Sequence, residues 1–167
     1  MFESRVPQTV RRIVLGLNGG PTDPLVVRVG CEIAKPQKAT LVAVHVIEVD
    51  WTRDLAEVVP GSAERASNIL DLAEAAAERA HVAIETQLLQ ARNVAAALVD
   101  EAVSQRADLV LVGLPYRRRF GGDFVMGRTI QYTLENAPMT VYVVREPIPA
   151  AASADTAGAP VPAAASR

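Results

Sequence analysis

The chain has 167 residues, half of them hydrophobic, which suits one domain around a single core better than two domains. Its formal net charge of −2 gives no reason to expect a nucleic-acid-binding surface, because proteins that bind phosphate backbones normally carry a clear positive excess. The single cysteine, Cys31, excludes an internal disulfide, and with only two histidines the chain has too few ligands for a structural zinc site.

The first predicted elements are two strands with a helix between them. Residues 12–17 form a short apolar run that ends at the turn sequence NGGPTDP, which predicts a buried strand followed by a loop. Apolar residues recur at helical spacing over residues 25–34, and the Lys35-Pro36 pair marks the expected helix end. Residues 40–49 are apolar on both faces, which suits a strand inside a sheet that is covered on both sides.

A long connection and a second helix come next. Residues 50–62 have no clean period and contain a Pro-Gly pair, which is typical of a connecting segment. The alanine-rich residues 63–80 have helical spacing, and Ser62 is the expected N-cap. Residues 82–89 alternate in polarity and predict a strand nearer the edge of the sheet.

The carboxyl-terminal half continues the alternation. Residues 94–105 predict a helix, and residues 108–113 predict a fully apolar strand. After a glycine- and arginine-rich loop, residues 129–136 predict a helix that Ala137-Pro138 ends. Residues 140–145 are the last predicted strand.

The alternation of strands and helices predicts the fold class. It implies right-handed crossovers and therefore an open doubly wound, Rossmann-like α/β domain, with a mainly parallel five-stranded sheet and helices on both faces. We assign this domain to residues 1–146. Residues 147–167 are a mixture of Ala, Pro, Ser and Gly without periodicity, which predicts a disordered tail.

Targeting signals are not apparent in the sequence. The amino-terminal residues contain no apolar run typical of a signal sequence, and no segment approaches the roughly 20 apolar residues of a membrane span. We therefore expect a cytoplasmic protein that does not insert directly into a membrane.

The loop after the fourth strand predicts an anion site. In doubly wound folds, ligands bind beyond the carboxyl ends of the strands where the strand order reverses, so the loops after strands one and four are expected to carry the site. Gly113 ends strand four, and Gly127 precedes a helix whose first turn would direct unpaired backbone N–H groups and a positive dipole end at one place. Arg117 and Arg128 add forked donors that match phosphate, and Thr129 adds a hydroxyl or a helix cap.

The arginines of this loop have a second interpretation. Residues 117–128 hold four arginines against one aspartate, a local charge of +3, so positive charge is concentrated here. Three of the arginines are consecutive (Arg117, Arg118 and Arg119), and neighbouring side chains diverge, so they cannot all face one ligand. A solvated charge run is the alternative to phosphate contact.

The loop after the first strand offers polar groups at the same edge of the sheet. Asn18 follows Leu17 at the strand end and could hydrogen-bond a sugar hydroxyl or a base. The alternative is that Asn18 and its neighbouring glycines only make a turn, with Thr22 or Asp23 capping the next helix. His45 lies within an apolar strand, where a paired core histidine is expected in preference to a catalytic base.

No residue pattern in the sequence indicates catalysis. We find no nucleophile elbow, no carboxylate pair at the apolar strand ends and no metal-ligand cluster. We therefore expect a protein that is not an enzyme, and leave a weak ATPase open as an alternative that would need a general base and a metal site.

Three segments resemble the universal stress protein family over roughly residues 10–145. RRIVLGLNGG resembles the first strand and loop of that family, LVAVHVIE its second strand, and ADLVLVGLPY with GRTIQYTLENAPMTVYVV its carboxyl-terminal signature. Family members that bind ATP carry G-x2-G-x9-G-[S/T] in the last segment. The resemblance implies that Val46, Val112 and Gly113, and Gly127 after a one-residue insertion, occupy positions that contact ATP.

Three positions depart from the family pattern. Tyr116 replaces the second glycine, Arg128 replaces the Ser/Thr with Thr129 one place later, and Asn18 replaces an aspartate. The resemblance implies ATP or another adenine nucleotide as the ligand, with Mg²⁺ a possible companion. The departures leave open a cyclic dinucleotide or a different anion.

The resemblance also implies a function and partners. It implies a non-enzymatic, adenine-nucleotide-binding regulatory module of the stress response, and a homodimer formed through residues 140–145, since an apolar edge strand should not remain exposed. The alternative is a nucleotide-free dimeric interaction module. It would regulate a partner such as a transporter, because PYRRRFGGDF also resembles transporter-associated stress-protein domains.

Overall fold

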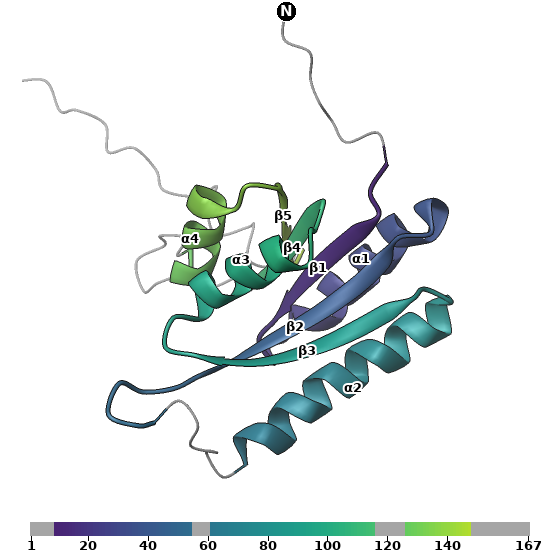
Figure 1. The fold of residues 1–167 in the computed structure, drawn as a ribbon. Coiled ribbons are helices and arrows are strands. Elements are labelled where there is room, and N and C mark those ends of the chain that lie inside the picture. The colour runs from purple at the N-terminus through teal and green to yellow at the C-terminus, as the bar shows by residue number, and fades with distance from the viewer. Residues whose placement is uncertain (1–8, 55–60, 116–125, 148–167) are drawn as a thin grey trace, which may run out of the picture.

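The computed structural model describes residues 9–54, 61–115 and 126–147, and within these ranges strands and helices alternate as the sequence predicts (Figure 1). In chain order the elements are β1 (Arg12–Leu17), α1 (Asp23–Gln37), β2 (Thr40–Glu48), α2 (Ser62–Ala80), β3 (Ile84–Ala91), α3 (Val94–Ser104), β4 (Leu109–Leu114), α4 (Arg128–Asn136) and β5 (Thr140–Arg145). The strands form one five-stranded sheet in the order β3-β2-β1-β4-β5, and each neighbouring pair is parallel. The predicted doubly wound α/β fold is thus confirmed.

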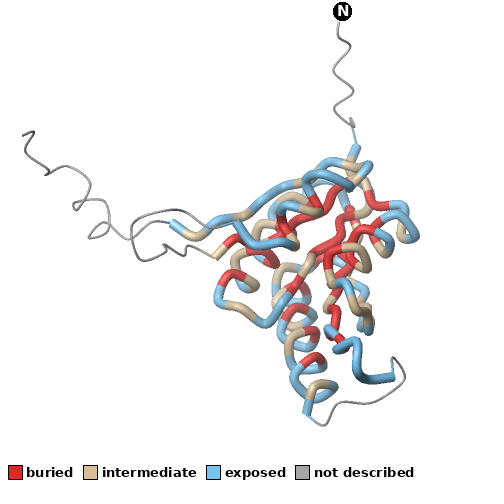
Figure 2. The backbone as a smooth tube through the Cα atoms, turned by 90° about the vertical axis from the view of Figure 1, so that its left-hand side faces the viewer, coloured by how far each residue is buried: buried red, intermediate tan, exposed pale blue. Residues whose placement is uncertain are grey.

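Alternate residues of the central strands face two separate apolar layers. Ile13 and Leu15 pack with α1 and α2 on one face, whereas Val14 packs with α3 and α4 on the other. Leu15 and Leu111, on the neighbouring strands β1 and β4, are fully buried. Figure 2 shows the buried segments concentrated along the middle of the molecule. This two-sided burial explains why the central strands are apolar at consecutive positions.

The end of α1 and the start of α2 differ from the predicted positions. Helix α1 continues through Pro36 and ends where Lys38 takes a left-handed conformation with φ 55°. The amide of Ala39 then bonds to the carbonyl of Ala34 at 3.0 Å and that of Lys38 to the carbonyl of Lys35 at 3.3 Å, which satisfies two of the last carbonyls of the helix. Ser62 is the first residue of α2, and Gly61, with φ 76°, is its N-cap.

The two edges of the sheet are formed by β3 and β5. The edge position of β3 agrees with the prediction that residues 82–89 lie nearer the edge, although β3 begins and ends two residues later than predicted. On β5, the side chains of Tyr142 and Val143 are 49% and 37% exposed. Among the described residues, none of the helices combines the length and hydrophobicity needed to span a bilayer.

Candidate functional site

A cavity of about 320 Å³ opens at the carboxyl ends of β1, β2 and β4, where the strand order reverses. Seven of the nine residues that the sequence singled out line it, and these are Leu17, Asn18, Val46, Val112, Gly113, Gly127 and Thr129. Arg128 lines an adjoining cavity of about 620 Å³ that shares several of these residues. Arg117 lies outside the described residues, as do Tyr116 and the other two consecutive arginines.

The amino terminus of α4 is at this cavity. Gly127 is the N-cap in an extended conformation, with φ −67° and ψ 151°, and no side chain caps the helix. Its carbonyl accepts hydrogen bonds from the amides of Ile130 and Gln131 at 3.1 and 3.2 Å. Among the described residues, nothing accepts from the amides of Arg128 and Thr129. These two N–H groups lie at the positive end of the helix dipole, which favours an anion.

The packing of α4 holds this terminus in place. Ile130 is buried in the apolar layer shared with α3, and Thr133 is fully buried. The Thr133 hydroxyl donates to the carbonyl of Thr129 at 2.7 Å, so the only polar atom of that side chain is satisfied inside the helix. The first turn is therefore fixed by contacts that do not use the N–H groups of Arg128 and Thr129.

Gly113 allows close packing between β4 and α1. A Cβ atom at this position would lie 3.1 Å from side-chain carbons of both Thr22 and Val26. A side chain at this position would therefore press against α1 on the face of β4 that this helix covers. Gly113 also lines the cavity, so the cavity wall and the helix contact depend on the same residue.

The loop after β1 is held by Asp23. Its carboxylate accepts from the amide of Gly19 at 2.7 Å and from the amide of Asn18 at 3.1 Å. The Asn18 side-chain oxygen accepts from the amide of Gly20 at 2.8 Å, and Gly19 takes the left-handed conformation with φ 78°. Both interpretations of Asn18 thus agree with the structure. The turn forms, and no described residue accepts from the side-chain NH₂ group, which could bond to a ligand.

Burial raises the pKa of the Asp23 carboxyl above its ordinary value of 3.8, although the hydrogen bonds from Gly19 and Asn18 act in the opposite direction. The stability that this group contributes is therefore fully present below the pKa of the unfolded chain, and is lost as the pH rises through the folded pKa. Relative to the variant Asp23→Asn, the wild type should lose free energy of unfolding as the pH rises from about 3.8. Urea unfolding of both proteins at several acidic pH values measures this, and a difference that stays constant or grows with pH would contradict it.

His45 is paired, as the sequence suggested. Its half-buried ring donates from Nδ1 to the carbonyl of Leu17 at 2.9 Å, which ties the end of β1 to β2. The bond fixes the backbone that forms one wall of both cavities.

The sequence interpretation missed several residues of the two cavities. Val94 and Leu98 of α3 line the smaller cavity, although the sequence pattern of residues 94–105 predicted only a helix. Trp51 is 80% exposed and lines the larger cavity. The Arg92 guanidinium lies 4.9 Å from the centre of its ring and donates to the carbonyls of Asp50 and Arg53. An isolated tryptophan in an aperiodic segment gave no signal of this arrangement.

The charge of the larger cavity is mixed, with Arg92 and Arg128 facing it beside Glu48. Within the part of the chain that the structure describes, no three His, Cys, Asp or Glu side chains form a group that could hold a metal ion. The arrangement can therefore offer an anion two arginines and two backbone N–H groups, next to an apolar pocket.

Comparison with known proteins finds a family whose model matches most of the chain. Residues 9–145 match the model of the Universal stress protein family. The comparison with curated proteins finds no match.

Solved structures share the fold at low sequence identity. A universal stress protein in complex with cAMP is 20% identical, with a TM-score of 0.62 over 82% of this chain and 98% of the other. The universal stress protein of Archaeoglobus fulgidus in complex with dAMP is 18% identical, with a TM-score of 0.65 over 80% and 97%. A family protein of Arabidopsis thaliana with AMP bound is 11% identical, with a TM-score of 0.59 over 82% and 92%.

Proposed function

The chain belongs to the universal stress protein family, and from this premise we propose that it binds an adenine nucleotide in the 320 Å³ cavity and acts as a regulatory module of the stress response. The observation that carries the proposal is the pair of N–H groups of Arg128 and Thr129 at the cavity, to which no described residue offers an acceptor. The ligands of the three similar structures, cAMP, dAMP and AMP, each combine an adenine with a phosphate.

The lining of the cavity supports a definite orientation of the nucleotide. The phosphate is proposed to accept from the two amides, with the Arg128 side chain beside it in the adjoining cavity. The adenine would lie against the apolar wall formed by Leu17 and Val46, and the ribose near the Asn18 NH₂ group. Arg117 is proposed to add a further phosphate contact, and Mg²⁺ would accompany a nucleoside triphosphate.

Regulation without catalysis is part of the same proposal. Nucleotide binding would change the surface that a partner meets, and a transporter is one such partner. We further propose that the protein works in the cytoplasm, where adenine nucleotides are available, and that residues 147–167 form a tail outside the folded domain.

Titration calorimetry with AMP, ATP and cyclic di-AMP, with and without Mg²⁺, tests the proposal. Because the proposal depends on the phosphate site, AMP should bind at least tenfold more tightly than adenosine, which has the same base and sugar. Affinity for AMP should also fall as salt is raised, since screening weakens contacts of partly exposed charges. Equal affinity for adenosine and AMP, or no heat with any nucleotide, would refute the phosphate site.

The sheet edge supports a second proposal, a homodimer formed through β5. This strand pairs on one side with β4 and is the last strand of the sheet. Tyr142 and Val143 leave apolar surface exposed along it, and an unpaired apolar edge tends to pair with another strand. Such a dimer is compatible with nucleotide binding and with the nucleotide-free alternative.

A further inference from the structure

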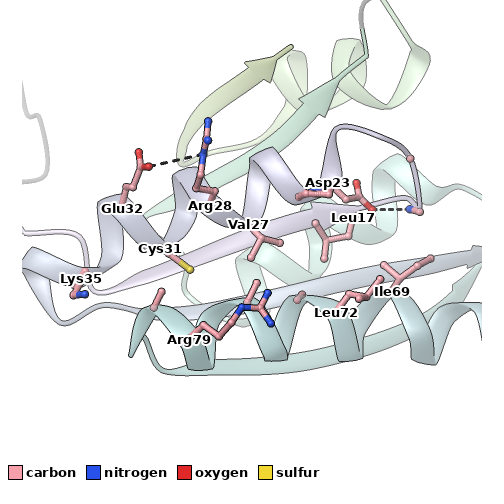
Figure 3. A pocket seen from close by; sticks show the side chains of 16 residues that line it. Leu17, Asp23, Val27, Arg28, Cys31, Glu32, Lys35, Ile69, Leu72 and Arg79 are labelled. Atoms are coloured by element: carbon pink, nitrogen blue, oxygen red, sulfur yellow. Dashed lines mark hydrogen bonds and ion pairs between the residues drawn. The ribbon is translucent and has the colours of Figure 1, made fainter. Parts of the chain in front are cut away.

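A second large cavity lies on the opposite face of the sheet, between α1 and α2 (Figure 3). Its volume is about 620 Å³, within the range of small-molecule sites. Helix α1 contributes Val27 and Cys31 to its walls, and α2 contributes Ile69, Leu72 and Ala76. The cavity is thus a mostly apolar groove between two helices, separated by the sheet from the proposed nucleotide site.

Small side chains on α2 explain why the groove is open. Ala73, Ala76 and Ala80 face it at helical spacing, where larger residues would fill the space between the helices. Leu72 at its margin is 72% exposed, so apolar surface there has no cover among the described residues. Apolar surface that stays in contact with water favours a ligand that can remove it.

Two cationic side chains that line the groove have no ion-pair or hydrogen-bond partner among the described residues. Lys35 and Arg79 lie in the last turns of α1 and α2, and nothing in the described chain forms a hydrogen bond or ion pair with either side chain. The acidic residues of the groove are already engaged, since Glu32 pairs with Arg28 at 3.9 Å and Asp23 accepts from the loop amides. Figure 3 places Lys35 at one end of the groove and Leu17 and Ile69 toward the other, with the Arg79 side chain reaching from the Lys35 end toward the middle, below Val27.

We propose that this groove binds a free medium-chain carboxylate, with the acyl chain along the alanines of α2 and the carboxylate beside Lys35 and Arg79. An apolar channel with positive charge at one end complements a molecule that has an apolar chain and one anionic end. From Ile69 to Ala80 the helix rises about 16 Å, which is similar to the length of an acyl chain of about twelve carbons. Cys31 lines the groove and is the only cysteine of the chain, which gives a specific probe of occupancy.

Calorimetry with octanoate, decanoate and dodecanoate tests the chain site. Each added methylene that is buried should tighten binding roughly three- to fourfold. Bound dodecanoate should also slow alkylation of Cys31 by a maleimide. The variant Ala76→Leu, which fills the groove, should lose both effects while unfolding at a temperature close to that of the wild type. Absence of binding by all three carboxylates, or undiminished binding by Ala76→Leu, would overturn the proposal.

The double variant Lys35→Gln/Arg79→Gln tests the carboxylate end. Because these side chains are exposed, their loss should weaken the binding of dodecanoate by up to about tenfold without unfolding the protein. The binding of neutral decanol should be unaffected. Arg65→Gln, an exposed arginine on α2 outside the groove, is the matched control and should bind dodecanoate as the wild type does. Equal dodecanoate affinity in the double variant and the control would show that the two cations do not hold the carboxylate.

Discussion

Replacing Gly127 by aspartate is expected to stabilise the folded protein and to weaken AMP binding at least tenfold. Gly127 has the extended conformation of an N-cap, and a Cβ atom there would meet no atom of the described residues within 4 Å, so the new side chain fits against them. Its carboxylate would accept from the amide of Thr129 in the first turn of α4 and interact favourably with the helix dipole, which together should add about 0.5–1 kcal/mol to the free energy of unfolding. The same carboxylate would occupy the place proposed for the phosphate and would repel the charge of the phosphate.

Urea unfolding and AMP calorimetry on the same preparations measure both effects. Gly127→Ala is the matched control, because it adds a Cβ atom without a polar group and leaves the amides open. It should bind AMP nearly as the wild type does and be slightly less stable than Gly127→Asp. If Gly127→Asp bound AMP as tightly as Gly127→Ala, the phosphate could not lie at the start of α4.

Val143→Lys is expected to convert the proposed homodimer into a monomer. Val143 is 37% exposed on the edge strand β5, and a dimer formed there would bring two lysines together in a contact that excludes water. Like charges that face each other across strands are unfavourable, and lysine on an edge strand opposes pairing. The change lies outside the nucleotide cavity, so AMP affinity per chain should be preserved.

Sedimentation velocity at several protein concentrations measures the oligomeric state. Gln90→Lys is the control, because Gln90 is an exposed residue on β3, the opposite edge of the sheet. It should leave the dimer intact. A wild type that sediments as a monomer, or a dimer that persists in Val143→Lys, would exclude pairing through β5.

The fold was predictable because burial on two faces leaves a strong signal in the sequence. Strands such as β2 and β4 lie between helices on both sides and therefore read as continuous apolar runs. Helix ends were less predictable, since they depend on backbone conformations such as the left-handed one of Lys38. The residue type of Lys38 does not indicate that conformation. Pro36 is tolerated near the helix end, where few hydrogen bonds are lost.

The position of the candidate site followed from the strand order, which placed both of its loops at the same edge of the sheet. The sequence could not show that Asp23 binds the amides of Asn18 and Gly19, because such a contact depends on the path of the loop. It also could not show the groove between α1 and α2, since alanines at helical spacing equally predict close packing. Arg117 remains a prediction from the sequence, outside the described residues.

The most direct test of the nucleotide site is an amide ¹H–¹⁵N titration of the labelled full chain with AMP. Binding at the start of α4 predicts that the resonances of Arg128 and Thr129 shift most, together with that of Asn18. The amides of Ala76 and Arg79, on the opposite face of the sheet, should not move. Saturating AMP that leaves Arg128 and Thr129 unshifted would contradict the phosphate site.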